Sequence, residues 1–207
     1  KENTGKEVLF TIATRDMNKV AAQSLLLGAA LMGLQNVVAV QGDRFTERDL
    51  ATVQTVTDVR PTELVSSVNS MNHGLDFRGG KLRSSTNLCI GAAIDLGHEI
   101  QRETKLTRKK VEAGAQFFLL QALFDPQKLE EFLEGYERRY GEALTIPVFC
   151  GIQVMTADSL VFGEVPKWVN DDLEKGRSGE DIAVQVLNQF VGQGVKSIYL
   201  IPPIMRG

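Results

Sequence analysis

Cysteine is scarce in this sequence, which limits the sites that it can form. Only Cys89 and Cys150 occur among 207 residues, and both lie in apolar segments that predict strands. They match neither the close pairing of a metal site nor a disulfide framework. We therefore expect buried thiols, no metal site and a reducing, cytoplasmic setting.

Long apolar runs and a charge excess of one sign are also absent. No apolar stretch approaches the roughly 20 residues that span a bilayer, and the polar start does not resemble a signal peptide. The net charge is −3, with lysine and arginine spread along the chain. These features give no reason to expect a nucleic-acid or membrane partner.

What the sequence does contain is six short apolar runs that end in polar residues and alternate with segments of helical character. Continuous apolar runs are typical of strands covered on both faces, as in parallel sheets. Alternation with helices predicts βα units. The runs are residues 7–14 (EVLFTIAT), 36–40 (NVVAV), 87–93 (NLCIGAA), 117–120 (FFLL), 147–151 (PVFCG) and 197–201 (SIYLI).

The absence of a dinucleotide-binding motif favours a barrel, and the number of strands indicates how much of the barrel the chain contains. No glycine fingerprint for dinucleotides follows any run, which argues against a Rossmann fold. A (β/α)8 TIM barrel needs eight strands. We therefore predict α/β class and a TIM barrel with six of its eight strands in this chain. We expect one partial barrel domain over residues 1–207, without the first two βα units and the last helix.

The segments between the runs predict five helices and two irregular stretches. The stretches are a polar loop at residues 44–60 and an irregular segment at 156–176. Asp16 is the expected N-cap of the first helix, and Arg15-Asp16 is interpreted as a helix start. The predicted helices are residues 16–34, 61–72, 99–113, 125–140 and 179–193.

Polar residues follow the strands, and strand ends in a parallel barrel open onto the face where active sites lie. We therefore expect these residues to form one active site. They are Arg15-Asp16, Gln41-Gly42-Asp43, Asp95 with His98, Gln121, Gln153 and Arg206.

Eight ordered elements resemble the methylenetetrahydrofolate reductase family, whose members are flavoprotein barrels. The resemblance implies FAD as cofactor and NADH or NADPH as co-substrate. It also implies hydride transfer to 5,10-methylenetetrahydrofolate, which gives 5-methyltetrahydrofolate for one-carbon metabolism and methionine biosynthesis. The elements are residues 13–18 (ATRDMN), 23–29 (QSLLLGA), 35–43 (QNVVAVQGD), 89–93 (CIGAA), 110–115 (KVEAGA), 117–125 (FFLLQALFD), 146–152 (IPVFCGI) and 197–203 (SIYLIPP).

The same resemblance implies roles for individual residues. Asp43 matches the acidic residue beside the flavin ring, where a carboxylate disfavours the anionic reduced form and influences catalysis. Gln121 matches a glutamine that binds the pterin, for which an amide offers both a donor and an acceptor. Arg206 matches a contact to the glutamyl carboxylate of folate. The expected FAD-binding residues are Thr11, Gln41, Gly42, Asp43, Asp58, Asp95, His98, Lys109 and Lys110.

Three departures leave other functions open. The family's general acid, a glutamate on its first strand, would fall before Lys1. Thr11 stands where some members have histidine or glutamine, and Asp95 where some have tyrosine. The alternative is a non-catalytic or partner-dependent barrel subunit, and we expect a homo-oligomer or a partner subunit.

Two further alternatives depend on the substrate and the electron source. A reductase for another one-carbon carrier, or one that takes electrons from a protein, remains possible from the sequence. A flavin-independent lyase or aldolase would need a Schiff-base lysine or a metal cluster at the strand ends, and the sequence offers neither.

Overall fold

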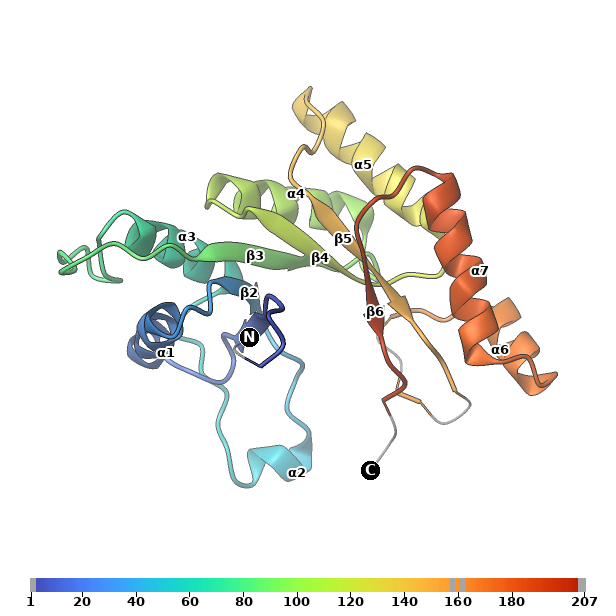
Figure 1. Ribbon diagram of the computed structural model, residues 1–207, viewed down its shortest axis with the longest axis horizontal. Helices are drawn as coiled ribbons and strands as arrows, with labels where there is room; N and C mark the ends of the chain where they lie inside the picture. The colour runs from blue at the N-terminus through green and yellow to red at the C-terminus, as the bar shows by residue number, and fades with distance from the viewer. Residues whose placement is uncertain (1–2, 157–158, 161–162, 205–207) are drawn as a thin grey trace. The chain divides into compact units, whose positions relative to one another are not determined.

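The computed structural model describes residues 3–156, 159–160 and 163–204. Within these ranges six strands alternate with seven helices (Figure 1). In chain order the elements are β1 (Leu9–Ala13), α1 (Lys19–Leu31), β2 (Asn36–Val40), α2 (Glu47–Leu50), α3 (Pro61–Asn72), β3 (Cys89–Ile94), α4 (Ile100–Glu112), β4 (Phe117–Ala122), α5 (Pro126–Tyr140), β5 (Val148–Gln153), α6 (Lys167–Glu174), α7 (Gly179–Gly192) and β6 (Ile198–Ile201).

The strands pair in parallel, as the apolar runs predict. β1 pairs with β2 and β2 with β3, while β4 pairs with β5 and β5 with β6. Six parallel strands with interleaved helices confirm the α/β class and are consistent with a partial TIM barrel.

The chain forms two compact units. Unit 1 comprises residues 1–93 and 108–117, and unit 2 comprises residues 94–107 and 118–207. In unit 1, helix α3 packs on β2. Its buried side chains recur at helical spacing, so one face of α3 meets the strands. These side chains are Leu64, Val65, Val68 and Met71.

Gly91 on β3 allows a close approach within unit 1. Val38 of β2 lies opposite it, and the ring of Phe117 lies above it. A Cβ at position 91 would stand 2.4 Å from two carbons of that ring. The absence of a side chain therefore creates the space that Phe117 fills.

Unit 2 is built on β4, β5 and β6. Helix α7 packs on β5, with its apolar residues directed inward as the sequence predicts. Helix α5 contributes a second apolar face. The buried side chains of the two helices include Leu129, Phe132, Tyr136, Ile182, Val186 and Phe190.

The helix predictions hold with three corrections. Helix α1 begins at Lys19 with Asn18 as its N-cap, because the Asn18 side chain accepts from the Ala21 amide; Asp16 is not the cap. The stretch expected to be irregular contains α6, which begins directly after Pro166. The predicted polar loop contains the one-turn helix α2, closed by a capping box between Thr46 and Asp49.

The two thiols differ in burial. Cys150 is buried as expected, whereas Cys89 is half-buried, because it is the first residue of β3 and does not lie in its middle.

None of the helices in the described residues has the length and apolarity to cross a membrane.

Candidate functional site

The structure divides the predicted site residues between the two units. Arg206 lies outside the described residues. Unit 1 contains Thr11, Gln41, Gly42, Asp43, Asp58, Lys109 and Lys110, and unit 2 contains Asp95, His98 and Gln121.

In unit 1, residues 41–43 form an irregular segment, with neither a turn nor a bend, directly after β2. Gly42 has a φ of +83°, a left-handed conformation that favours glycine. A Cβ at this position would also lie 3.0 Å from Arg15 Nε and 3.2 Å from Ala13 Cβ. The segment therefore needs glycine for its backbone and for its packing, and the Asp43 side chain that follows is exposed to solvent.

Arg15 fixes the position of this segment, a role that the local sequence pattern does not indicate. Its Nη1 donates to the main-chain carbonyl of Asp43, and its guanidinium stacks 4.0 Å from the centre of the Phe45 ring. Asp16 accepts from Arg15 Nε at 2.8 Å, and this bond is the main reason why the pKa of Arg15 is raised. Arg15-Asp16 thus holds the segment after β2 in place and is not a helix start.

The main chain of Arg15 also forms bonds to the segment after β2 and to the segment between α2 and α3. Its amide donates to Gln41 O at 3.1 Å, and its carbonyl accepts from Val56 N at 2.8 Å. Both the side chain and the backbone of this residue therefore fix the loop that follows β1 to the loop that follows β2.

Asp58 has a structural partner in unit 1. Its Oδ2 accepts from the amide of Lys19, the first residue of α1, at 2.8 Å. A carboxylate at this point satisfies an amide that has no partner within the helix and complements the helix dipole. Thr11 lies exposed in the middle of β1, opposite Val38.

The two predicted lysines behave differently. Lys110 lies in the last turn of α4, and its Nζ donates to Ala93 O, near the carboxyl end of β3, at 2.6 Å. Lys109 is exposed on the same turn. Of the pair, only Lys110 is shown reaching toward a strand end.

In unit 2, a pocket of about 200 Å3 opens at the carboxyl ends of β3 and β4. It brings together Asp95 and Gln121, which the sequence predicts as site residues. Its lining is residues 95–97, 120–125, Lys128, Gly163, Glu164 and Pro166. The pocket thus contains an amide, several carboxylates, one ammonium group and apolar walls, which suits a small polar ring.

Three contacts shape the pocket walls. Asp95 accepts from Gly97 N at 2.8 Å, and its other oxygen lies 3.4 Å from His98 Nε2. At the rim, Lys128 donates to Glu164 at 2.6 Å, which lowers the pKa of that carboxyl group.

Gly163 lies against the end of β4. A Cβ there would stand 2.6 Å from Ala122 O. The backbone at this position therefore approaches the strand end more closely than a larger residue would allow.

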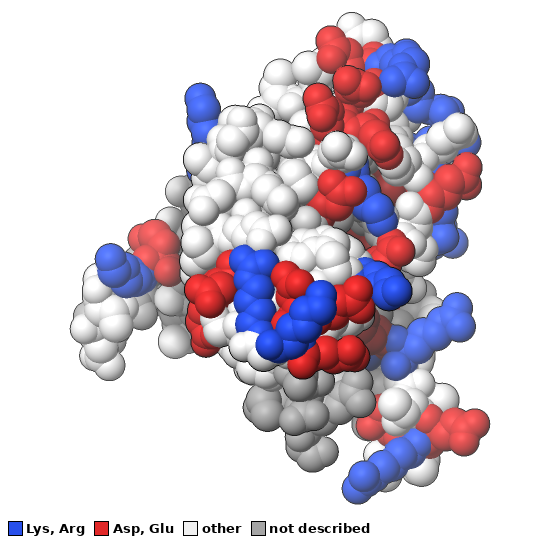
Figure 2. Space-filling model, turned by 90° about the vertical axis from the view of Figure 1, so that its right-hand side faces the viewer, with Lys and Arg blue, Asp and Glu red and all other residues white. Residues whose placement is uncertain are grey.

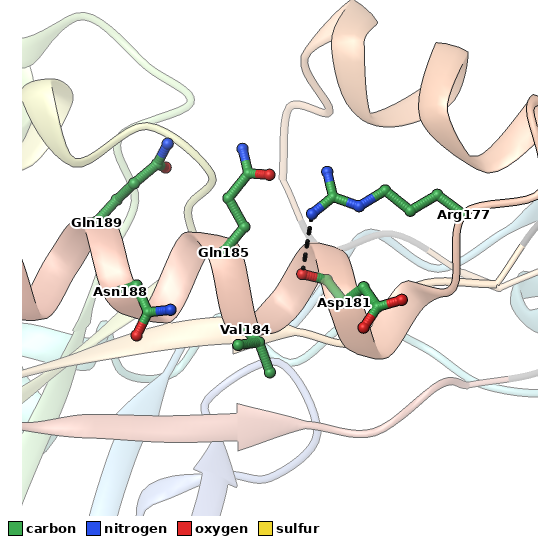
Figure 3. Close-up of a pocket in the computed structure, with 6 residues that line it drawn as sticks. All are labelled: Arg177, Asp181, Val184, Gln185, Asn188 and Gln189. Carbon is green, nitrogen blue, oxygen red and sulfur yellow. Dashed lines mark hydrogen bonds between the residues drawn. The ribbon is translucent and has the colours of Figure 1, made fainter.

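A larger hollow of about 610 Å3 lies elsewhere in unit 2 (Figure 3). Its lining comes from α7 and the nearby Arg177, which donates to Asp181 O at 3.3 Å. Gln185 and Gln189 project from α7 on the same side as the Arg177 guanidinium (Figure 3). No strand end contributes, so this is a polar helix surface and not the predicted site.

Charged residues are mixed on the surface. Acidic and basic side chains lie next to one another in the centre of the face that Figure 2 shows.

Among the described residues, no group of three or more histidine, cysteine, aspartate or glutamate side chains is arranged to hold a metal ion.

Comparison with solved structures gives two distant likenesses. One is an uncharacterized protein from Clostridium thermocellum that binds two copies of 5-methyl-5,6,7,8-tetrahydrofolic acid, with 12% identity and a TM-score of 0.48 over 99% of this chain and 92% of that chain. The other is dihydrodipicolinate synthase from Bacteroides thetaiotaomicron, with 13% identity and a TM-score of 0.41 over 95% of this chain and 62% of that chain. Neither likeness is strong enough to support an argument.

Comparison of the sequence with protein families is more informative. Curated protein sequences give no significant match. The family model described as methylenetetrahydrofolate reductase matches residues 1–202. The match confirms the resemblance of the eight motifs, and the chain belongs to the methylenetetrahydrofolate reductase family.

Proposed function

We propose that the protein is an FAD-dependent reductase that transfers a hydride from NADH or NADPH to 5,10-methylenetetrahydrofolate and releases 5-methyltetrahydrofolate. The observation that carries this proposal is the family match, which extends over residues 1–202. The pocket that contains Asp95 and Gln121 adds support from unit 2.

The residues of unit 1 fit a flavin nucleotide. Directly after Gly42 the Asp43 side chain is exposed, so a flat ring has access to its carboxylate. Lys110 provides a cation near the end of β3, and an ammonium group is a common partner of phosphate groups. When bound, FAD would supply a carrier that takes a hydride from the nicotinamide and passes it to the folate.

We assign Asp43 to the control of flavin reactivity. Its carboxylate is exposed, and its main-chain carbonyl is held by Arg15. A negative charge beside the pyrimidine end of the flavin would raise the free energy of the anionic reduced ring. Asp43 would therefore favour release of the hydride to the folate.

We assign Gln121 to recognition of the pterin. Its side chain is exposed and lines the pocket of unit 2. A primary amide donates and accepts at the same edge, which matches a pterin edge that carries both kinds of group. Gln121 would orient the folate and exclude rings that lack this pattern.

The spectrum of the purified protein tests the proposed reaction. We expect a visible flavin band that NADH or NADPH bleaches in the absence of oxygen and that 5,10-methylenetetrahydrofolate then restores. A folded protein, judged by circular dichroism, that carries no flavin and does not bind added FAD would overturn the proposal.

A matched pair of glutamine variants tests the substrate role. Gln121→Ala should weaken 5-methyltetrahydrofolate binding by roughly tenfold, as expected for loss of a polar recognition contact, and should retain FAD. Gln189→Ala, on the exposed face of α7, should change neither. Equal folate affinity in the two variants would contradict the role of Gln121.

A further inference from the structure

We propose that Tyr199 is a positioning residue for Gln121: its hydroxyl group holds the carbonyl of Leu120 and so fixes the β-bulge that presents the Gln121 amide to the pocket. The inference rests on the proposed role of Gln121 as a folate contact. It assigns a specific function to a strand residue that the pocket itself does not include.

The bulge is visible in the pairing of β4 with β5. Leu120 lies opposite Cys150, and Ala122 lies opposite Gly151, the next residue of β5. Gln121 is therefore an extra residue with no partner in this register. A bulge of this kind bends the strand and changes the direction of a side chain, and bulges are frequent beside active sites.

Tyr199 reaches this bulge from the neighbouring strand. It lies on β6, opposite Gly151, and its hydroxyl group donates to Leu120 O at 2.9 Å. The hydrogen bond thus crosses from β6 over β5 to β4 and ends one residue before Gln121. Fixing that carbonyl limits how the peptide between Leu120 and Gln121 can rotate.

Gly151 provides the passage for the tyrosine side chain. A Cβ at position 151 would stand 2.8 Å from the Tyr199 hydroxyl oxygen and 3.0 Å from Leu120 O. Any larger residue would therefore occupy the path between donor and acceptor. Gly151 on β5 thus leaves the space through which the side chain of Tyr199 on β6 reaches the bulge.

The phenol has the protonation state that this role requires. The hydroxyl group must keep its proton in order to donate to a carbonyl. Burial raises the pKa of Tyr199, and Cys150 raises it further. The hydroxyl group therefore stays protonated at and well above neutral pH.

A double-mutant cycle between Tyr199→Phe and Gln121→Ala tests the inference. In the purified protein loaded with FAD, Tyr199→Phe should raise the Kd for 5-methyltetrahydrofolate roughly fivefold, as expected for loss of one partly buried hydrogen bond. The rate of flavin reduction by NADH should not change. In the Gln121→Ala background, Tyr199→Phe should change that Kd by less than about twofold, because the residue on which it acts is gone.

Two variants control the cycle. Tyr140→Phe removes a hydroxyl group from the last residue of α5, roughly 20 Å along the helix from the end that lines the pocket, and should leave folate affinity unchanged. Gly151→Ala should reproduce the folate defect of Tyr199→Phe, because it displaces the same hydroxyl group. If Gly151→Ala does not fold, Tyr199→Phe alone completes the cycle.

The outcomes separate this inference from the proposed function. If Gln121→Ala weakens folate binding and Tyr199→Phe has the same effect in both backgrounds, or no effect in either, the positioning role of Tyr199 is wrong and the role of Gln121 stands. If Gln121→Ala leaves folate binding unchanged, both ideas are overturned.

Discussion

Arg15 donates a hydrogen bond from its guanidinium to the main-chain carbonyl of Asp43, 28 residues further along the chain. This contact joins the loop after β1 to the segment after β2, and Gly42 has no side chain that would obstruct it. The position of the Asp43 carboxylate thus depends on a residue from a different strand end.

Replacing Arg15 should therefore make the segment after β2 more mobile. Arg15→Ala removes the bond to Asp43 O and the stacking on Phe45, and we expect FAD to bind roughly tenfold more weakly. Dialysis followed by measurement of bound flavin checks this result. Arg48→Ala, on the exposed helix α2, is the control and should retain FAD as the original protein does.

Neutralising Asp43 should alter the two half-reactions in opposite directions. Asp43→Asn removes the charge that opposes the anionic reduced ring, so flavin reduction by NADH should become faster and reoxidation by 5,10-methylenetetrahydrofolate slower. Stopped-flow absorbance measures both rates. Equal changes in both half-reactions would argue that Asp43 acts only on binding.

Replacing Gly91 and Gly28 by alanine should change the stability of the protein in opposite directions. Gly91→Ala would place a Cβ 2.4 Å from the Phe117 ring, and overpacking of this kind typically costs about 1–3 kcal/mol. Gly28→Ala, inside α1 with nothing within 4 Å, should stabilise the protein by up to about 1 kcal/mol. Urea unfolding of the two variants measures both effects, and a stable Gly91→Ala protein would show that Phe117 can move aside.

The stability of the protein should fall at alkaline pH. Burial raises the pKa of the Cys150 thiol from 9.0 to about 11. The folded chain therefore keeps this proton at a pH where the unfolded chain loses it, and ionisation favours unfolding. The contribution is present below pH 9 and is lost by about pH 11; it is at most about 3 kcal/mol.

The Cys150→Ala variant isolates this effect. Its free energy of unfolding should decrease less between pH 9 and about 11 than that of the original protein. In this variant Tyr199 and Cys89 should still lower the free energy of unfolding at alkaline pH, because burial also raises their pKa values. Identical pH profiles for the two proteins would show that Cys150 is not the group responsible.

The strands and most helices could be predicted because their signals are local. Pro61 and Gly141 mark the ends of α3 and α5 as expected, since proline suits a first helical turn and glycine a left-handed cap. Helix α6 was missed because it has only eight residues and offers few positions from which to recognise a helical period.

The sequence indicates candidate site residues but not the contacts that hold them in place. Gln121 and Asp95 follow apolar runs, so the sequence indicates them directly. The bond from Arg15 to Asp43 and the bond from Tyr199 to Leu120 join residues 28 and 79 positions apart. Nothing in the local pattern distinguishes such partners, because a tyrosine inside a strand resembles any other buried aromatic residue.

The tyrosine that crosses over Gly151 also limits which substitutions the sheet can accept. A side chain at position 151 displaces the Tyr199 hydroxyl group unless residue 199 becomes smaller, and a smaller residue at 199 leaves both a gap over Gly151 and a carbonyl without this donor. Positions 151 and 199 should therefore change together or not at all. In a library randomised at both, folded and folate-binding members should cluster into few compatible pairs.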